Sequence, residues 1–144
     1  MRKIAVGLLV ALVTMMAMSM QAGHEWARVQ GVEADTKGAV LSFDTTIVQM
    51  GNVVSKKTPL VTAVFHFTNK GETPLVLHRV ETSCGCTKVT YPEKPIPAGH
   101  KDSISVTYDS RRSSGGHFRK SITVHSNAVQ QTTVLYIEGY VTTD

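Results

Sequence analysis

Cysteine is scarce in this chain, and the two that occur stand together. The 144 residues contain two cysteines, Cys84 and Cys86, which are separated only by Gly85. No Cys-x-x-Cys pair accompanies them, and two thiols fall short of the four ligands that a structural zinc site usually has. A zinc-finger site is therefore excluded. Because no cysteine stands near the expected signal cleavage site, we also expect no lipoprotein anchor.

The chain also has little net charge. The full sequence carries +4, and removal of Arg2 and Lys3 with an N-terminal signal lowers this to +2. So mild a charge does not favour nucleic acid or an acidic surface as a partner. We therefore expect no nucleic-acid binding.

Helical periodicity is missing after the N-terminal segment, and so are internal repeats and low-complexity tracts. Short segments instead alternate apolar and polar residues, as where Phe65 and Phe67 alternate with His66 and Thr68. About seven such segments, with turn residues between them, predict an all-β fold in the form of a two-sheet β-sandwich. The residues predicted to form its core are Val61, Phe65, Phe67, Leu77, Val106, Ile122 and Ile137.

The connecting segments add three expectations. A shift in spacing at Val80 predicts a β-bulge just before the cysteines. The prolines of 92–97 cannot lie inside a central strand, so this segment is expected to cross between the sheets. The basic loop 110–116 could hold an anion with Arg111 and Arg112, although a solvated turn is the favoured interpretation. The expected strands are 39–43, 46–49, 60–68, 75–82, 103–108, 118–125 and 133–141.

The N-terminus has the layout of a secretory signal peptide, predicted for residues 1–22. Basic residues precede an apolar run of about 15 residues, which is shorter than the roughly 20 that a spanning helix needs. Cleavage is expected after Ser19 or after Ala22. The sequence thus predicts an exported protein of the periplasm or extracellular space without a stable membrane anchor. A mobile leader is expected over 23–38 and one β-sandwich domain over 39–144.

The Cys-Gly-Cys segment allows several kinds of chemistry. Cys84 and Cys86 could form a disulfide if the backbone curls slightly, which Gly85 permits. A ring this short removes little unfolded-state entropy, so the disulfide would add little to the stability of the fold. The alternatives are a redox-active pair, a strained structural turn, or a soft-metal site for copper as Cu(I), with His78 as a further ligand. A Gly-x-Ser-x-Gly nucleophile motif is absent, so the residues leave catalysis undecided and favour a protein that is not an enzyme.

Several motifs together resemble those of a known family. They are FHFTNKG at 65–71, Pro74-Leu75, Val80, SCGCT at 83–87, PIPAG at 95–99 and ITVHSN at 122–127. With these motifs the sequence is similar to domain of unknown function fifteen-seventy-three, found mostly in exported proteins of Bacteroidota, and the similarity covers about 41–141. The resemblance implies an immunoglobulin-like β-sandwich of the kind seen in pilus-chaperone and cilium-associated domains, with no established activity.

The leading functional hypothesis is an exported binding or interaction module that recognises an unknown protein or another cell-envelope partner. Immunoglobulin-like sandwiches present sheet edges and loops to their partners, and no catalytic constellation is recognisable in the sequence. A copper-binding protein and a thiol redox protein, both acting through Cys84 and Cys86, remain as alternatives.

Overall fold

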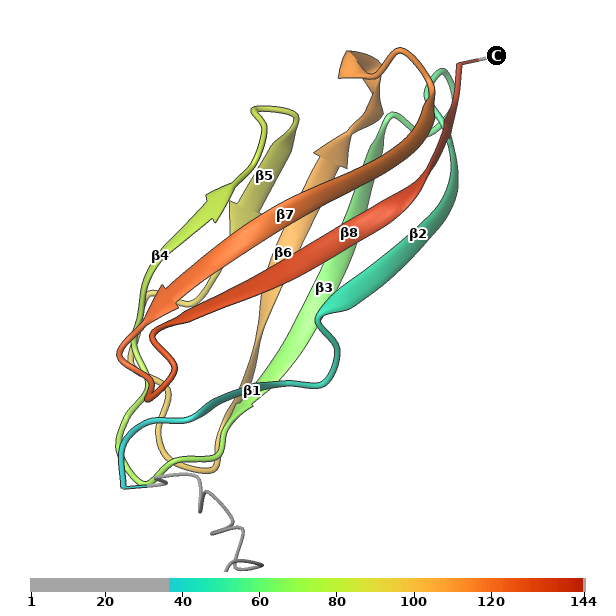
Figure 1. Ribbon diagram of the computed structural model, residues 1–144. Helices are drawn as coiled ribbons and strands as arrows, with labels where there is room; N and C mark the ends of the chain where they lie inside the picture. The colour runs from blue at the N-terminus through green and yellow to red at the C-terminus, as the bar shows by residue number, and fades with distance from the viewer. Residues whose placement is uncertain (1–36, 144) are drawn as a thin grey trace, which may run out of the picture. The chain divides into compact units, whose positions relative to one another are not determined.

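The computed structural model describes residues 37–143. The predicted signal peptide and nearly all of the predicted leader lie outside this range. Eight strands form two four-stranded sheets that face one another, in the orders β1-β3-β6-β5 and β2-β8-β7-β4 (Figure 1). The strands are β1 Leu41–Phe43, β2 Ile47–Val54, β3 Leu60–Asn69, β4 Leu77–Thr82, β5 Thr87–Thr90, β6 Lys101–Asp109, β7 Gly116–Ser126 and β8 Thr132–Thr142. The predicted β-sandwich is confirmed, with one strand more than the expected count.

Helical structure is limited to the short 3₁₀ helix η1, Ser110–Arg112, within residues 37–143. No helix in this part of the chain is long and apolar enough to cross a membrane.

Side-chain alternation places the core between the sheets. Along β3, Ala63, Phe65 and Phe67 are buried, whereas the side chains between them face solvent. The same rule operates in β6, β7 and β8, because successive strand residues point to opposite faces of a sheet. Six of the seven predicted core residues are buried. Val61 is half-buried, because it is the second residue of β3 and packs only against the edge of the core.

Two irregularities modify the β2-β8-β7-β4 sheet. The register between β4 and β7 shifts between Leu77 and Arg79, so His78 is the extra residue of a bulge. A bulge is therefore present in β4, but it lies at the start of the strand and not at Val80 just before the cysteines, as had been expected. A second shift, between Gln49 and Gly51, occurs where β2 runs parallel to β8 opposite Gly139. A Cβ atom on Gly139 would lie 2.7 Å from the Gly51 carbonyl oxygen, so only glycine fits there.

The proline-rich segment 91–100 does not cross between the sheets, as had been expected. It connects β5 to β6, which are neighbours in one sheet. Its middle nevertheless touches the chain entering the other sheet, because Ile96 and Leu75 exchange two backbone hydrogen bonds of 2.8 Å. Both side chains are buried, so this bridge closes one end of the core.

Asn69 is the buried polar centre at that end of the molecule. Its amide nitrogen donates to the carbonyl oxygens of Thr73 at 2.8 Å and Ile96 at 3.0 Å. Its side-chain oxygen accepts from the backbone N–H groups of Val40 at 3.2 Å and Gly71 at 3.0 Å. The fully buried Asn69 amide therefore satisfies four backbone groups from three segments of the chain.

Candidate functional site

Cys84 and Cys86 lie in the short connection between β4 and β5 and form a disulfide, with their Cα atoms 5.3 Å apart. This separation lies within the usual range for bonded cysteines. The backbone turns tightly here, since the Thr87 N–H donates to the Cys84 carbonyl at 3.2 Å. The hydroxyl of Thr82 donates to the same carbonyl at 3.1 Å. Both cysteines are half-buried, so the sulfur atoms sit at the boundary between the core and solvent.

The Cys-Gly-Cys loop is attached to its surroundings from two sides. On one side, the Asp109 N–H donates to the Cys86 carbonyl at 2.8 Å, and Nη1 of Arg112 donates to the Gly85 carbonyl at 2.9 Å. On the other side, the Ser83 N–H donates to the Ser121 carbonyl at 3.0 Å, and the Ser121 N–H donates to the Ser83 hydroxyl at 3.1 Å. The loop therefore keeps several ties to both sheets that do not depend on the disulfide.

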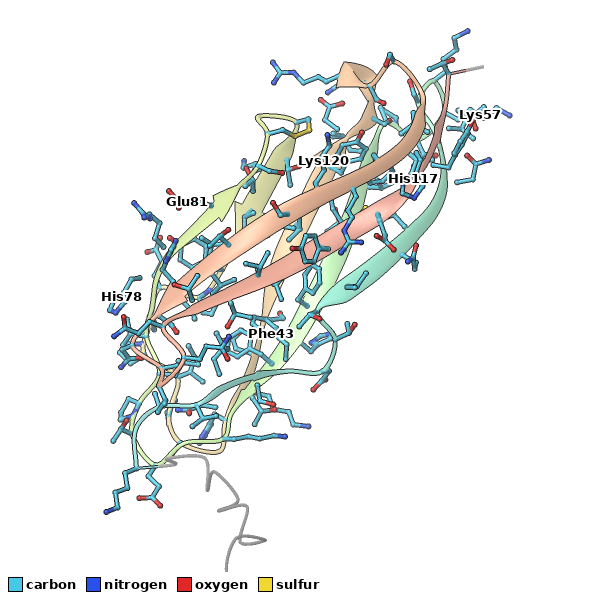
Figure 2. All side chains as sticks on the ribbon, in the orientation of Figure 1. Phe43, Lys57, His78, Glu81, His117 and Lys120 are labelled. Carbon is cyan, nitrogen blue, oxygen red and sulfur yellow. A yellow bond between two sulfur atoms is a disulfide. The ribbon has the colours of Figure 1, made fainter. Side chains whose placement is uncertain are left out.

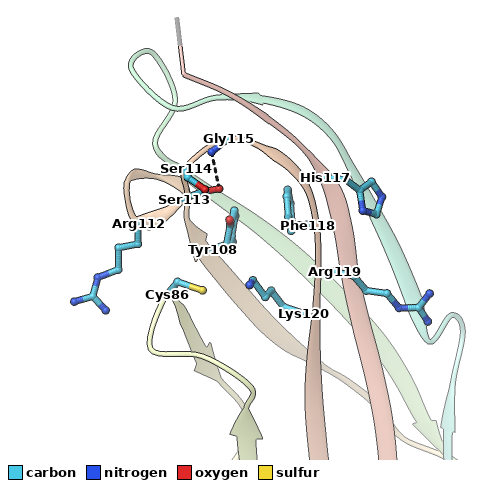
Figure 3. Close-up of a pocket in the computed structure, with 10 residues that line it drawn as sticks. All are labelled: Cys86, Tyr108, Arg112, Ser113, Ser114, Gly115, His117, Phe118, Arg119 and Lys120. Atoms are coloured by element: carbon cyan, nitrogen blue, oxygen red, sulfur yellow. Dashed lines mark hydrogen bonds between the residues drawn. The ribbon is translucent and has the colours of Figure 1, made fainter.

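A pocket of about 390 Å³ opens beside this loop, at the end of the sandwich where η1 leads into β7 (Figure 3). Its walls come from the Cys-Gly-Cys loop, β6, η1, the η1–β7 connection and β7. In Figure 3 the sulfur of Cys86 and the side chain of Lys120 point toward one another across the pocket. The lining residues are Cys86, Tyr108, Arg112, Ser113, Ser114, Gly115, His117, Phe118, Arg119 and Lys120.

Arg111 and Arg112 have different roles beside the pocket. Arg111 forms a forked ion pair with Asp109, with nitrogen-to-oxygen distances of 2.9 and 2.8 Å. Its hydrogen bonds lower the pKa of the Asp109 carboxyl below the usual value for aspartate. Asp109 also caps η1, because its carboxylate accepts from the Arg111 N–H. Arg112 instead reaches the Cys-Gly-Cys loop.

The outer face of the β2-β8-β7-β4 sheet is a second candidate surface. Exposed apolar and aromatic side chains stand on it, with Tyr140 54%, Ile47 40% and Val134 38% accessible to solvent. Tyr136 lies on the same face of β8, where the guanidinium of Arg119 stacks 4.2 Å from its ring centre. The sequence analysis did not identify this face, although alternate apolar residues at 134, 136 and 140 were a visible signal.

The family of the chain follows from comparison with known sequences. The model of the family DUF1573, described as a protein of unknown function, matches residues 41–141. The chain belongs to this family. A comparison with curated proteins found no match.

Solved structures identify the fold of this DUF1573 protein. The PapD-like domain 7 of human CEP192 superposes with a TM-score of 0.64 at 8% identity, over 85% of this chain and 99% of that domain. A protein of unknown function from Porphyromonas gingivalis W83 gives 0.63 at 18% identity, over 71% of this chain and 46% of its own. This chain thus spans about half the length of that protein. The secreted serine protease VesC of Vibrio cholerae gives 0.52 at 13% identity, over 71% and 23%. These likenesses confirm the immunoglobulin-like fold.

His78 is not brought to the cysteines in this DUF1573 domain. It is exposed on the bulge of β4, and Figure 2 shows the disulfide at the opposite end of that strand. The residues between them run as extended chain, which rises about 3.3 Å per residue. No group of three or more His, Cys, Asp or Glu side chains placed to hold a metal occurs within residues 37–143.

Proposed function

We propose that this DUF1573 domain is an exported, non-enzymatic binding module that docks a protein of the cell envelope. The docking surface is the outer face of the β2-β8-β7-β4 sheet around Tyr140, called the Tyr140 face below. The exposure of Tyr140 on the central strand β8 is the observation that carries this proposal. Export is supported by the basic and apolar layout of residues 1–22. N-terminal sequencing of the mature protein is expected to begin at Met20 or Gly23.

The composition of the Tyr140 face suits a protein partner. Tyrosine and arginine are enriched among the residues that dominate protein interfaces, because they bury large areas and also form directional polar contacts. Arg119 is held in place by stacking on Tyr136 and by an ion pair with Glu138 at 3.4 Å. A partner would therefore meet a cation that is already oriented, which reduces the entropy lost on binding.

The proposal is tested with two matched substitutions, Tyr140→Ser and Val64→Ser. Both remove an exposed apolar side chain from a central strand, but Val64 is on the outer face of the other sheet, on β3. Immobilised wild type and Val64→Ser are expected to retain the same envelope protein, and Tyr140→Ser to lose it. Equal recovery by all three folded proteins would rule out the Tyr140 face. Light scattering of the isolated protein tests self-association, and a dimer that Tyr140→Ser dissociates would also contradict the proposal.

Thiol–disulfide exchange through Cys84 and Cys86 is a second candidate function. The supporting observation is that both sulfurs are half-buried in a loop that other hydrogen bonds also hold. A partner thiolate would attack one sulfur and form a mixed disulfide, while the other cysteine leaves as a thiolate; a second partner thiol would complete the two-electron reduction. Equilibration in glutathione buffers, followed by mass measurement of the trapped forms, gives the potential. A potential as low as that of ordinary structural disulfides would exclude this role.

Copper binding requires the reduced form of the same two cysteines. Two thiolates suit Cu(I), a soft ion. Reduced wild type is expected to bind Cu(I) under this alternative, and the Cys84→Ser, Cys86→Ser double variant is expected not to. Equal copper content in the two proteins would exclude copper binding through Cys84 and Cys86.

A further inference from the structure

We propose that the pocket beside the Cys-Gly-Cys loop binds a small molecule through an anionic oxygen group, a carboxylate or a phosphate, and that Lys120 is its principal cation. This site goes beyond the proposed docking function, and Lys120 lies on the inward side of β7, whereas the Tyr140 face is the outer side of that sheet. Its volume of about 390 Å³ lies in the range of small-molecule pockets, so it can accept more than a single inorganic ion.

The lining residues of the pocket include no aspartate or glutamate. Among its basic lining residues, Lys120 points into the pocket in Figure 3, whereas the side chains of Arg112, His117 and Arg119 point away from it. The hydroxyl groups of Ser113 and Ser114 add polar atoms on the η1–β7 side. A concave site that a cation enters and that carboxylates do not line attracts anions, because the low-dielectric walls concentrate the field.

Lys120 differs from the neighbouring arginines in its contacts with the described residues 37–143. Arg111 pairs with Asp109, Arg119 pairs with Glu138, and Arg112 donates to the Gly85 carbonyl. Lys120, in contrast, makes no hydrogen bond or ion pair with any residue of the described range 37–143. Arg112 keeps its charge beside the neutral Gly85 carbonyl, but its guanidinium points away from the pocket in Figure 3, so Lys120 is the cation that faces the pocket without an ion-pair partner in residues 37–143.

The position of Lys120 on β7 directs its side chain into the pocket. Along β7, Phe118 and Ile122 are buried between the sheets, and Lys120 lies on the same face of the strand. It stands opposite Ile137, another core residue. Lysine at such a half-buried, inward-facing position loses part of its hydration, and an anion in the pocket would restore favourable contacts to the ammonium group.

The test uses acetate and phosphate as probes at constant ionic strength, with acetamide as the uncharged analogue of acetate. Backbone amide shifts are followed by NMR in the mature protein. Acetate or phosphate is expected to shift the signals of Cys86, Gly115 and Phe118 in a saturable way, whereas acetamide is not. Saturation with acetate alone assigns a carboxylate ligand, and saturation with phosphate alone assigns a phosphate.

Two variants make the test specific to Lys120. Lys120→Met is expected to weaken binding at least tenfold, and Lys120→Arg to retain it, which controls for a loss caused by misfolding. Lys88→Met removes an exposed lysine of β5 and is expected to bind as wild type does. Shifts that do not saturate, that acetamide reproduces, or that persist unchanged in a folded Lys120→Met protein would overturn the proposal.

Discussion

Arg112 donates a hydrogen bond from Nη1 to the carbonyl oxygen of Gly85, 2.9 Å away, and so ties η1 to the Cys-Gly-Cys loop. The two residues are 27 positions apart in the sequence and belong to different connections of the sandwich. This contact fixes one wall of the pocket relative to the disulfide. The predictions below test this contact, the core and the role of the disulfide.

Arg112→Ala is expected to loosen the Cys-Gly-Cys loop with little effect on global stability. The lost hydrogen bond is exposed, so the free energy of unfolding should fall by about 0.5 to 1.5 kcal/mol at most. Hydrogen exchange at residues 84–87 should accelerate. Arg111→Ala is the matched control, because Arg111 binds Asp109 and does not touch the loop. Equal acceleration in both variants would mean that the Arg112 contact does not hold the loop.

Phe65→Ala is expected to lower the free energy of unfolding by about 3 to 5 kcal/mol, because it opens a cavity in the centre of the core. The adjacent substitution His66→Ala removes an exposed side chain from the same strand, and its effect should stay within about 0.5 kcal/mol. Denaturant unfolding of both variants measures the difference. Similar losses would show that the alternation along β3 is not as described.

Asn69→Ala is expected to destabilise the protein by at least about 2 kcal/mol, because it leaves buried backbone groups without partners. Asn127→Ala is the control. The Asn127 side chain also bonds two backbone groups, Val76 N–H and Pro74 C=O, but these bonds are exposed and water can replace them. Its loss should be about 1 kcal/mol or less. A smaller effect at Asn69 than at Asn127 would contradict the assignment of Asn69 as a buried structural centre.

Replacing both cysteines with serine is expected to change the free energy of unfolding by less than about 1 kcal/mol. The ring that the disulfide closes contains one intervening residue, so its opening releases little chain entropy. The loop also keeps its hydrogen bonds to Asp109, Arg112 and Ser121. Thermal unfolding of the oxidised wild type and the variant measures the change. Failure of the variant to fold would make the disulfide structural and remove both the redox and the copper alternatives.

The sequence predicted those features that depend on local alternation. The inward side of β3 and the presence of a bulge in β4 follow from spacing, because each strand side chain points to one face or the other. Contacts set by tertiary register were not predictable in this way. In the sequence, Lys120 cannot be distinguished from a surface lysine; its inward direction follows only from the burial of Phe118 and Ile122 on the same side of β7. Asn69 likewise has the sequence context of a turn residue, and its buried role depends on the distant Ile96.

The prediction that the proline-rich segment 91–100 crosses between the sheets was wrong because it, too, depended on tertiary strand pairing. Prolines exclude a central strand, but they do not decide which sheet the chain enters next. That choice depends on β5 pairing with β6, from Thr87 opposite Tyr108 to Thr90 opposite Ser105. The sequence analysis did not identify the Tyr140 face because it used the alternation along each strand only to find the buried side chains. Tyr140 lies on the exposed side of β8.

Site-specific photocross-linking in cells tests docking through the Tyr140 face most directly. A photoreactive phenylalanine analogue is introduced in place of Tyr140 in one strain and in place of Val64 in another, since both positions are exposed on central strands but face opposite ways. Irradiation is expected to give one discrete adduct with an envelope protein from position 140 and none from position 64. Adducts of equal yield from both positions, or an adduct from position 64 alone, would contradict the proposed docking surface.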